Sequence, residues 1–380
     1  MLNRKFGASS TIIILAILLK SSFLFPAGFC DNSMTYELMN TSNTSANYRL
    51  NVAVSQSLYD YYLSKSHALA NEYDFAKFVT PNALKPIADS LSQIYTDDEE
   101  LVNGALMIVH QIPYEATAPS KYPVETLVDN RGDCDLFSFI AASIMKAHGL
   151  DAVLLYYKNE AHMNVGVNLV QEPREARGQV SFVSSGSVKY YMAECTGNNW
   201  RDGWRVGECP DELKDAKPQI ITLDNSESSS PEQVTASYRT LASSAITLSA
   251  STSFAIQGNT VIFSGRLSPN LQNETITIYV RLNGAPWTAL GKATTNSDGY
   301  FSLAWIADAS TVCYVRASWS GDEDHSASDS QTLTITTLSM FFVLLIGMTF
   351  ALLVIGGAVY LVSRPHKQAV FEPEPPEIPS

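Results

Sequence analysis

The fold of this chain is decided by the stretch RGDCDLFSFIAASIMKAHG, residues 131–149. Asp133 can accept hydrogen bonds from the free amide groups of a helix start, and Gly149 is suited to end the helix after His148. Within the stretch, apolar residues recur at the spacing of one helical face: Phe137, Ile140, Ile144 and Met145. The stretch therefore predicts a buried central helix that begins at Cys134.

The segments before and after this helix differ in the spacing of their apolar residues. Residues 48–118 carry apolar residues at helical spacing, which predicts several helices before residue 131. After residue 149, a short apolar run at 152–157 and alternating runs at 161–169 and 188–194 predict strands. Helices followed by strands joined through short turns indicate an α+β domain, with helices packed on an antiparallel sheet.

The second half of the chain has a different pattern. Residues 224–237 are rich in Ser, Glu, Asp and Asn, a composition typical of a flexible linker. From residue 245 to 335, short alternating stretches recur between Gly, Asn and Asp turns. This region therefore predicts a small all-β sandwich that follows a linker.

Both ends of the chain predict membrane targeting. Arg4 and Lys5 precede an apolar run that Lys20 interrupts, which favours a cleaved signal peptide, with an uncleaved anchor as the alternative. Residues 338–362 contain no charged residue and are long enough to cross a bilayer as a helix. Arg364 and Lys367 follow at once, and basic residues favour the cytoplasmic side. We therefore expect a single-pass protein of the cell membrane with its large N-terminal part extracellular.

The expected organisation has six segments. They are a signal peptide (1–30), an α+β domain (31–215), a linker (216–240), a β-sandwich (241–337), a transmembrane helix (338–362) and a cytoplasmic tail (363–380). The formal net charge is −13 and Lys and Arg form no block, which argues against a nucleic-acid partner because such binding depends on clustered positive charge. We expect neither a cofactor nor a metal ion.

Three residues of the α+β region could carry chemistry. Cys134 opens the predicted helix, where free amides and the helix dipole stabilise a thiolate, although Asp133 and Asp135 oppose this effect. A structural or disulfide-bonded cysteine is the alternative at this position. His162 falls on the polar face of its strand, which suits a catalytic imidazole but also an ordinary surface histidine. Glu194 closes the third strand, where it could orient the imidazole or be an ordinary surface carboxylate.

Several motifs in the same region occur in a fixed order. They are QIPY (111–114), YPVETL (122–127), GDCD (132–135), AHMNVGV (161–167), MAECTG (192–197) and GWRVG (203–207). With these motifs the chain resembles the transglutaminase-like family, whose fold is related to that of papain-like cysteine enzymes, over about residues 111–210.

The resemblance implies roles for individual residues. Cys134 would be the nucleophile, His162 the general base and Glu194 the acid that orients the base, while Gln111 would form an oxyanion hole with the backbone amide of Cys134. The implied activity is attack on an amide bond of a protein or peptide, by hydrolysis or by acyl transfer to an amine. The alternative is a non-catalytic surface protein that uses the same fold for binding or for cell-envelope architecture.

Two further expectations accompany the resemblance. Cys195 and Cys209 fall where relatives usually carry other residues, and in an oxidising compartment we expect them to form a disulfide. The second domain resembles prokaryotic immunoglobulin-like surface repeats through GRLSP (265–269), NSDGY (296–300) and RASWSGD (316–322). We expect this domain to serve as a spacer or to contact components of the cell envelope.

Overall fold

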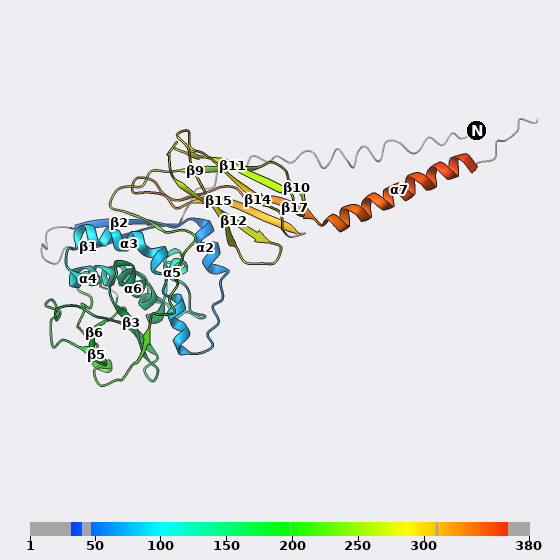
Figure 1. Ribbon diagram of the computed structural model, residues 1–380. Coiled ribbons are helices and arrows are strands. Elements are labelled where there is room, and N and C mark those ends of the chain that lie inside the picture. Colours follow the sequence, from blue (N-terminus) through cyan, green and yellow to red (C-terminus); the bar gives the residue numbers. More distant parts are fainter. Residues whose placement is uncertain (1–31, 40–46, 198, 309–310, 364–380) are drawn as a thin grey trace, which may run out of the picture.

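The computed structural model describes residues 32–39, 47–197, 199–308 and 311–363. Helices and several antiparallel sheets make it a mixed α+β structure, with one long apolar helix at its C-terminal end (Figure 1). The signal peptide expected at 1–30 and nearly all of the tail expected at 363–380 lie outside the described residues. The described residues up to 237 are called the N-terminal part, and those of 245–338 are called the sandwich.

The helix α6 (Cys134–His148) lies at the centre of the N-terminal part and confirms the helix expected there. Its residues 136–145 are all buried, and Gly149 ends it with a left-handed φ of 101°. The helices that pack against α6 are α3 (Pro81–Ile94), α4 (Asp98–Val109) and α5 (Pro123–Asp129). Complete burial explains why α6 is apolar on more sides than an amphipathic surface helix.

A five-stranded antiparallel sheet covers another side of α6. Its strand order is β5 (Phe182–Ser185), β6 (Val188–Ala193), β4 (His162–Val167), β3 (Ala152–Tyr157) and β7 (Gln219–Thr222). Met163, Val165 and Val167 of β4 pack into the same core as α6, whereas Tyr157 and Met192 belong to a core on the opposite face. The three strands expected from the sequence are present, with β4 shorter than the alternating pattern.

The beginning of the described chain differs from the helical expectation. Residues 48–53 lie in a strand, β2 (Asn47–Ala53), which pairs with β1 (Ser33–Met39) and with β8 (Thr235–Ser237). The helical structure starts only afterwards, with α2 (Gln56–Leu63), a 3-10 segment (Glu72–Phe78) and α3. Leu50 and Val52 are fully buried at a spacing of two, which is the period of a strand and not of a helix.

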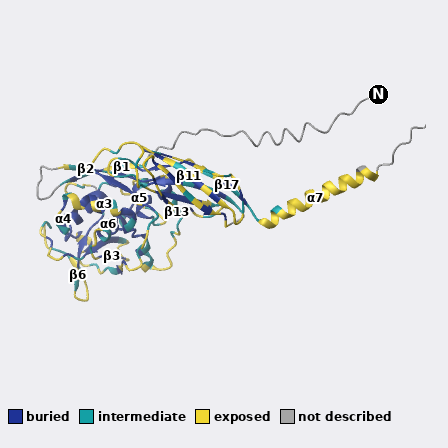
Figure 2. Ribbon diagram, turned by 45° about the horizontal axis from the view of Figure 1, so that its top comes forward, coloured by how far each residue is buried: buried dark blue, intermediate teal, exposed yellow. Residues whose placement is uncertain are grey.

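The sandwich consists of two sheets around a second core. The larger sheet contains β10 (Phe254–Ile256), β17 (Leu333–Leu338), β15 (Val312–Trp319), β12 (Thr275–Leu282) and β13 (Thr288–Thr294), with β16 (Ser328–Asp329) beside β15. The smaller one contains β14 (Tyr300–Ile306), β11 (Thr260–Ser268) and β9 (Ala245–Ala250). These strands confirm the short strands expected between residues 245 and 335, and Figure 2 shows buried positions running along the strands of this unit.

The linker expected at 216–240 contains two short strands. This region supplies β7 to the five-stranded sheet and β8 to the sheet of β1 and β2. Glu232 between them is buried. A polar composition predicted flexibility, but several polar groups here, such as Oε2 of Glu232, accept hydrogen bonds inside the protein, which offsets the cost of burying them.

Glu232 forms part of a polar contact between the N-terminal part and the sandwich. Its Oε2 accepts hydrogen bonds from Ser55 at 3.0 Å, Tyr279 at 3.0 Å and Ser318 at 2.9 Å. Nearby, Asp329 of β16 accepts the backbone amide of Gln56 at 2.6 Å. Burial and the neighbouring Asp329 raise the pKa of Glu232 to about 8, so this carboxyl group is largely protonated at neutral pH.

The C-terminal helix α7 (Met340–Ser363) contains a stretch of 21 residues, Met340–Tyr360, that is long and apolar enough to cross a membrane. It extends away from the sandwich and is exposed along its length (Figures 1 and 2). One residue, Ser339, separates it from β17, and the Ser339 hydroxyl accepts the amide of Phe342 at 3.2 Å.

The raised pKa of Glu232 predicts a pH-dependent stability. A carboxyl group with a folded-state pKa above its ordinary value of 4.5 binds its proton more tightly in the folded state. Its stabilising effect is complete at low pH and is lost as the pH rises through about 8. We expect the free energy of unfolding of the full chain in detergent to fall on the order of a few kcal/mol between pH 6 and pH 9.

Glu232→Gln should make this dependence much flatter, because the amide resembles the protonated acid. The exposed Glu212→Gln is the matched control and should behave like the wild type. Chemical unfolding followed by tryptophan fluorescence at several pH values measures both, and an equally steep loss in Glu232→Gln would contradict the assignment.

Candidate active site

Cys134 is the first residue of α6 and is half-buried. The turn before it is fixed by a neighbouring segment of the chain. The amide of Gly132 donates to the carbonyl of Pro113 at 3.2 Å, and the amide of Glu115 donates to the carbonyl of Gly132 at 2.6 Å. A thiol at this position lies at the positive end of the helix dipole, beside the amides of the first turn, which have no partner within the helix.

His162 begins β4 and contacts both other residues of the expected triad. Its Nε2 donates to Oε2 of Glu194 at 2.9 Å, which leaves Nδ1 for the thiol. The Cys134 Sγ lies 4.0 Å from the carbonyl oxygen of Ala161, directly before the histidine. Burial lowers the pKa of His162, but hydrogen bonds to Cys134 and Glu194 outweigh burial and raise it to about 10. The structure therefore brings the three residues together.

The backbone before His162 has an unusual conformation. Ala161 has a φ of 49°, in the left-handed region that non-glycine residues rarely occupy. The strain is located where the chain enters β4 beside Cys134, and such strain tends to persist where the surrounding structure fixes a functional geometry. The turn at Ala161 sets the direction from which the imidazole enters the site.

Glu194 is fully buried, and its carboxylate accepts four hydrogen bonds. Oε2 accepts from His162 and, at 3.2 Å, from Nδ2 of Asn164. Oε1 accepts from the amide of Thr196 at 2.8 Å and from its hydroxyl at 2.6 Å. Burial raises the pKa of Glu194, but the contacts with His162 and Thr196 outweigh burial and lower it. Glu194 is therefore an ionised carboxylate although it is fully buried.

Sequence reasoning missed the partners of Glu194. Asn164 is fully buried and lies two residues after His162, on the same face of β4. That spacing was a signal for its position, since β6 pairs with β4 and directs Glu194 toward the same face. His110 was missed too, and its Nε2 donates to the backbone carbonyl of Glu194 at 3.1 Å.

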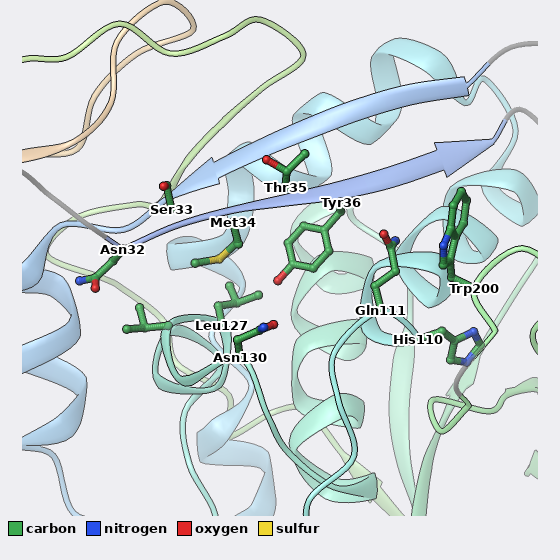
Figure 3. Close-up of a pocket in the computed structure, with 11 residues that line it drawn as sticks. Asn32, Ser33, Met34, Thr35, Tyr36, His110, Gln111, Leu127, Asn130 and Trp200 are labelled. Carbon is green, nitrogen blue, oxygen red and sulfur yellow. The ribbon is translucent and has the colours of Figure 1, made fainter.

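Gln111 lies elsewhere and is not part of the site. Its Nε2 donates to the carbonyls of Glu37 at 2.9 Å and Met107 at 2.8 Å, and its Oε1 accepts the amide of Glu37 at 2.8 Å. Both amide hydrogens are used to hold β1 against the end of α4. Figure 3 shows Gln111 beneath β1, beside His110 and Trp200, in a separate pocket. The expected role of Gln111 as an oxyanion donor is therefore wrong.

The expected disulfide between Cys195 and Cys209 is also wrong, since both thiols are free and buried. Cys195 packs in the core that contains α6, whereas Cys209 packs with Tyr157 in the core on the other face of the sheet. Their thiols donate instead to the carbonyls of Ala193 at 3.4 Å and Pro210 at 3.3 Å. The sheet between the two cysteines prevents the bond.

The described residues contain no group of three or more His, Cys, Asp or Glu side chains that could hold a metal ion. The expected site residues that the structure brings together are Cys134, His162 and Glu194.

Comparisons with known proteins identify no family. No model of a known protein family matches the chain. No curated protein matches it either. One solved structure that matches is described as "Structural basis of T cell specificity and activation by the bacterial superantigen toxic shock syndrome toxin-1". That chain is 13% identical, the match covers 25% of this chain and 99% of that chain, and the TM-score is 0.20. A likeness this weak carries no argument about fold or function.

The contacts of His162 predict how its titration responds to mutation. Glu194→Gln removes the buried negative charge while keeping a hydrogen-bond acceptor, so the pKa of His162 should fall from about 10 by at least about one unit. Nuclear magnetic resonance of histidine-labelled full chain in detergent micelles follows the imidazole directly. The titration of His148, at the opposite end of α6, is the internal control. An unchanged His162 would show that Glu194 does not set its charge.

Proposed function

We propose that this chain is a cysteine enzyme that attacks amide bonds through Cys134, His162 and Glu194. The observation that carries the proposal is the hydrogen bond from His162 Nε2 to the buried Glu194 carboxylate at 2.9 Å, with the Cys134 thiol near enough to the imidazole to raise its pKa. A cysteine at a helix start, a base within reach and a third group that orients the base form the arrangement of a nucleophilic triad.

The reaction begins with the thiolate of Cys134 and the imidazolium of His162. The thiolate attacks the carbonyl carbon, a C–S bond forms and negative charge develops on the carbonyl oxygen, which the first amides of α6 can stabilise. The imidazolium then transfers its proton to the leaving nitrogen, and the C–N bond breaks. Water or an amine then attacks the thioester carbon while the imidazole accepts the proton of that nucleophile, and the C–S bond breaks to release the acyl product and restore the Cys134 thiolate.

Two features of the site favour this chemistry. The ionised Glu194 holds His162 in one tautomer and stabilises its positive charge, which keeps the ion pair with the thiolate available near neutral pH. Asn164 and Thr196 satisfy the remaining positions of the Glu194 carboxylate, so the acid has no freedom to turn away from the imidazole.

We assign the N-terminal part to the transglutaminase-like family and the sandwich to prokaryotic-type immunoglobulin-like domains. The order of a cysteine on a helix start, a histidine on the next strand pair and an acid after β6 supports the first assignment. The apolar helix α7 supports a single membrane anchor, and we propose that the N-terminal part and the sandwich lie outside the cell. Proteins or peptides are the proposed substrates, with hydrolysis slightly preferred over acyl transfer.

The proposal predicts that Cys134→Ser lowers turnover of a peptide substrate by at least about a thousandfold, since an alcohol is a far weaker nucleophile than a thiolate. Membrane association and unfolding temperature should be unchanged. A panel of peptides, incubated with and without a primary amine and followed by mass spectrometry, measures hydrolysis and acyl transfer together.

Cys313→Ser is the matched control, because it makes the same sulfur-to-oxygen change in the core of the sandwich. Equal turnover by Cys134→Ser and the wild type would exclude Cys134 as the nucleophile. A wild-type protein without turnover and with an unreactive Cys134 would support the non-catalytic alternative.

A further inference from the structure

Two aspartates flank Cys134, and one of their oxygen atoms lacks a visible partner. Asp133 is 9% exposed; its Oδ2 accepts the amide of Thr117 at 2.7 Å, but its Oδ1 is buried and accepts no hydrogen bond in the described part of the protein. Asp135 accepts the hydroxyl of Ser120 at 2.6 Å. A buried carboxylate oxygen left unsatisfied is costly, so Asp133 Oδ1 requires an explanation.

Asp133 is the N-cap residue of α6 and Asp135 lies in its first turn, so the two side chains leave the same end of the helix and interact there. Ionised carboxylates can only accept hydrogen bonds, so a direct contact between two of them requires a proton on one. Burial and the contact with Asp133 raise the pKa of Asp135 to about 7, whereas the Ser120 hydroxyl lowers it. The same arrangement explains the unpartnered Oδ1, because a protonated Asp135 can donate to it.

In the described part of the chain, the cationic groups nearest the pair have other anionic partners. The segment before α6 contributes Tyr114, Glu115 and Arg131, and Arg131 forms an ion pair with Glu115 at 3.3 Å. From the sheet side, His162 faces Cys134 and is bonded to Glu194. Within the described residues, no Lys or Arg forms an ion pair with Asp133 or Asp135, so a proton is the charge that makes their contact favourable.

We propose that Asp133 and Asp135 share one proton, donated by Asp135 to Oδ1 of Asp133, and that this shared proton positions the start of α6 and limits the negative charge beside Cys134. The effect on Cys134 rests on the proposed function, whereas the shared proton itself does not. Thr117 and Ser120 donate hydrogen bonds to the pair, so the pair also fixes the start of α6 to the segment that contains these two residues.

The proposal makes Asp135 a positioning residue whose effect depends on pH. Loss of the proton leaves two adjacent carboxylates, breaks their contact and places a second negative charge next to Cys134, which disfavours the thiolate. Loss occurs as the pH rises through about 7. Above pH 7, Cys134 should therefore react more slowly in the wild type than in a variant whose residue 135 carries no charge.

The direct test titrates the full chain in detergent micelles with ¹³C-labelled aspartate carboxyl groups. The wild type should show a step near pH 7 that is missing in Asp135→Asn and retained in Asp298→Asn, an exposed aspartate of the sandwich. Ser120→Ala removes a donor that favours the ionised form, so it should move the step to higher pH. The proposal is overturned if the step persists in Asp135→Asn or if Ser120→Ala leaves it in place.

The second test measures alkylation of Cys134 by iodoacetamide across pH. The ratio of the Asp135→Asn rate to the wild-type rate should be about one below pH 6 and rise to about threefold or more above pH 8. A flat ratio would overturn the effect on Cys134. If Cys134 is unreactive in both proteins while the carboxyl step near pH 7 is present, the proposed function fails and the shared proton stands.

Discussion

The burial of α6 on every side is the constraint on which the N-terminal part depends. Residues 136–145 are all buried, so α3, α4, α5 and the five-stranded sheet must each take a position that covers one side of the same helix. The helix can meet solvent only at its ends. Cys134 stands at one of those ends, and its sulfur is thus positioned by the packing of the N-terminal part and not by a flexible loop.

The site also shows how buried charge is tolerated in this chain. Glu194 remains ionised because His162, Asn164 and Thr196 supply all of its hydrogen bonds. Glu232 has three donors on one oxygen and an aspartate nearby, and it retains its proton. The number of donors and the sign of the nearest charge decide which state a buried carboxyl group takes. The same rule applied to Asp133 and Asp135 favours one proton between them.

The sequence was informative where periodicity decides structure, as for α6 and for β3, β4 and β6. It failed for residues 48–53, which form β2 in the middle of a sheet between β1 and β8. It also failed for the parts of 216–240 that form β7 and β8, two short edge strands that pair with strands distant in sequence. Gln111 was misplaced because the direction of a side chain after a helix end depends on tertiary contacts. The disulfide was wrong because its two cysteines lie on opposite faces of the sheet. Cys195 continues the alternation of β6 on the α6 face, whereas the path that brings Cys209 to the other face depends on packing beyond residue 197.

The single residue between β17 and α7 limits where the proposed active site can work. One extended residue spans only about 3.5 Å, and Ser339 is already used to cap the helix. With α7 in a bilayer, the near end of the sandwich is held at the headgroup layer, and the N-terminal part lies at the far end of the sandwich (Figure 1). Catalysis would then take place at a nearly fixed height above the lipid surface. The site would then meet other membrane-anchored proteins by diffusion in the plane of the membrane. The distance of an amide bond from the lipid surface would select the substrate as much as the sequence around that bond does.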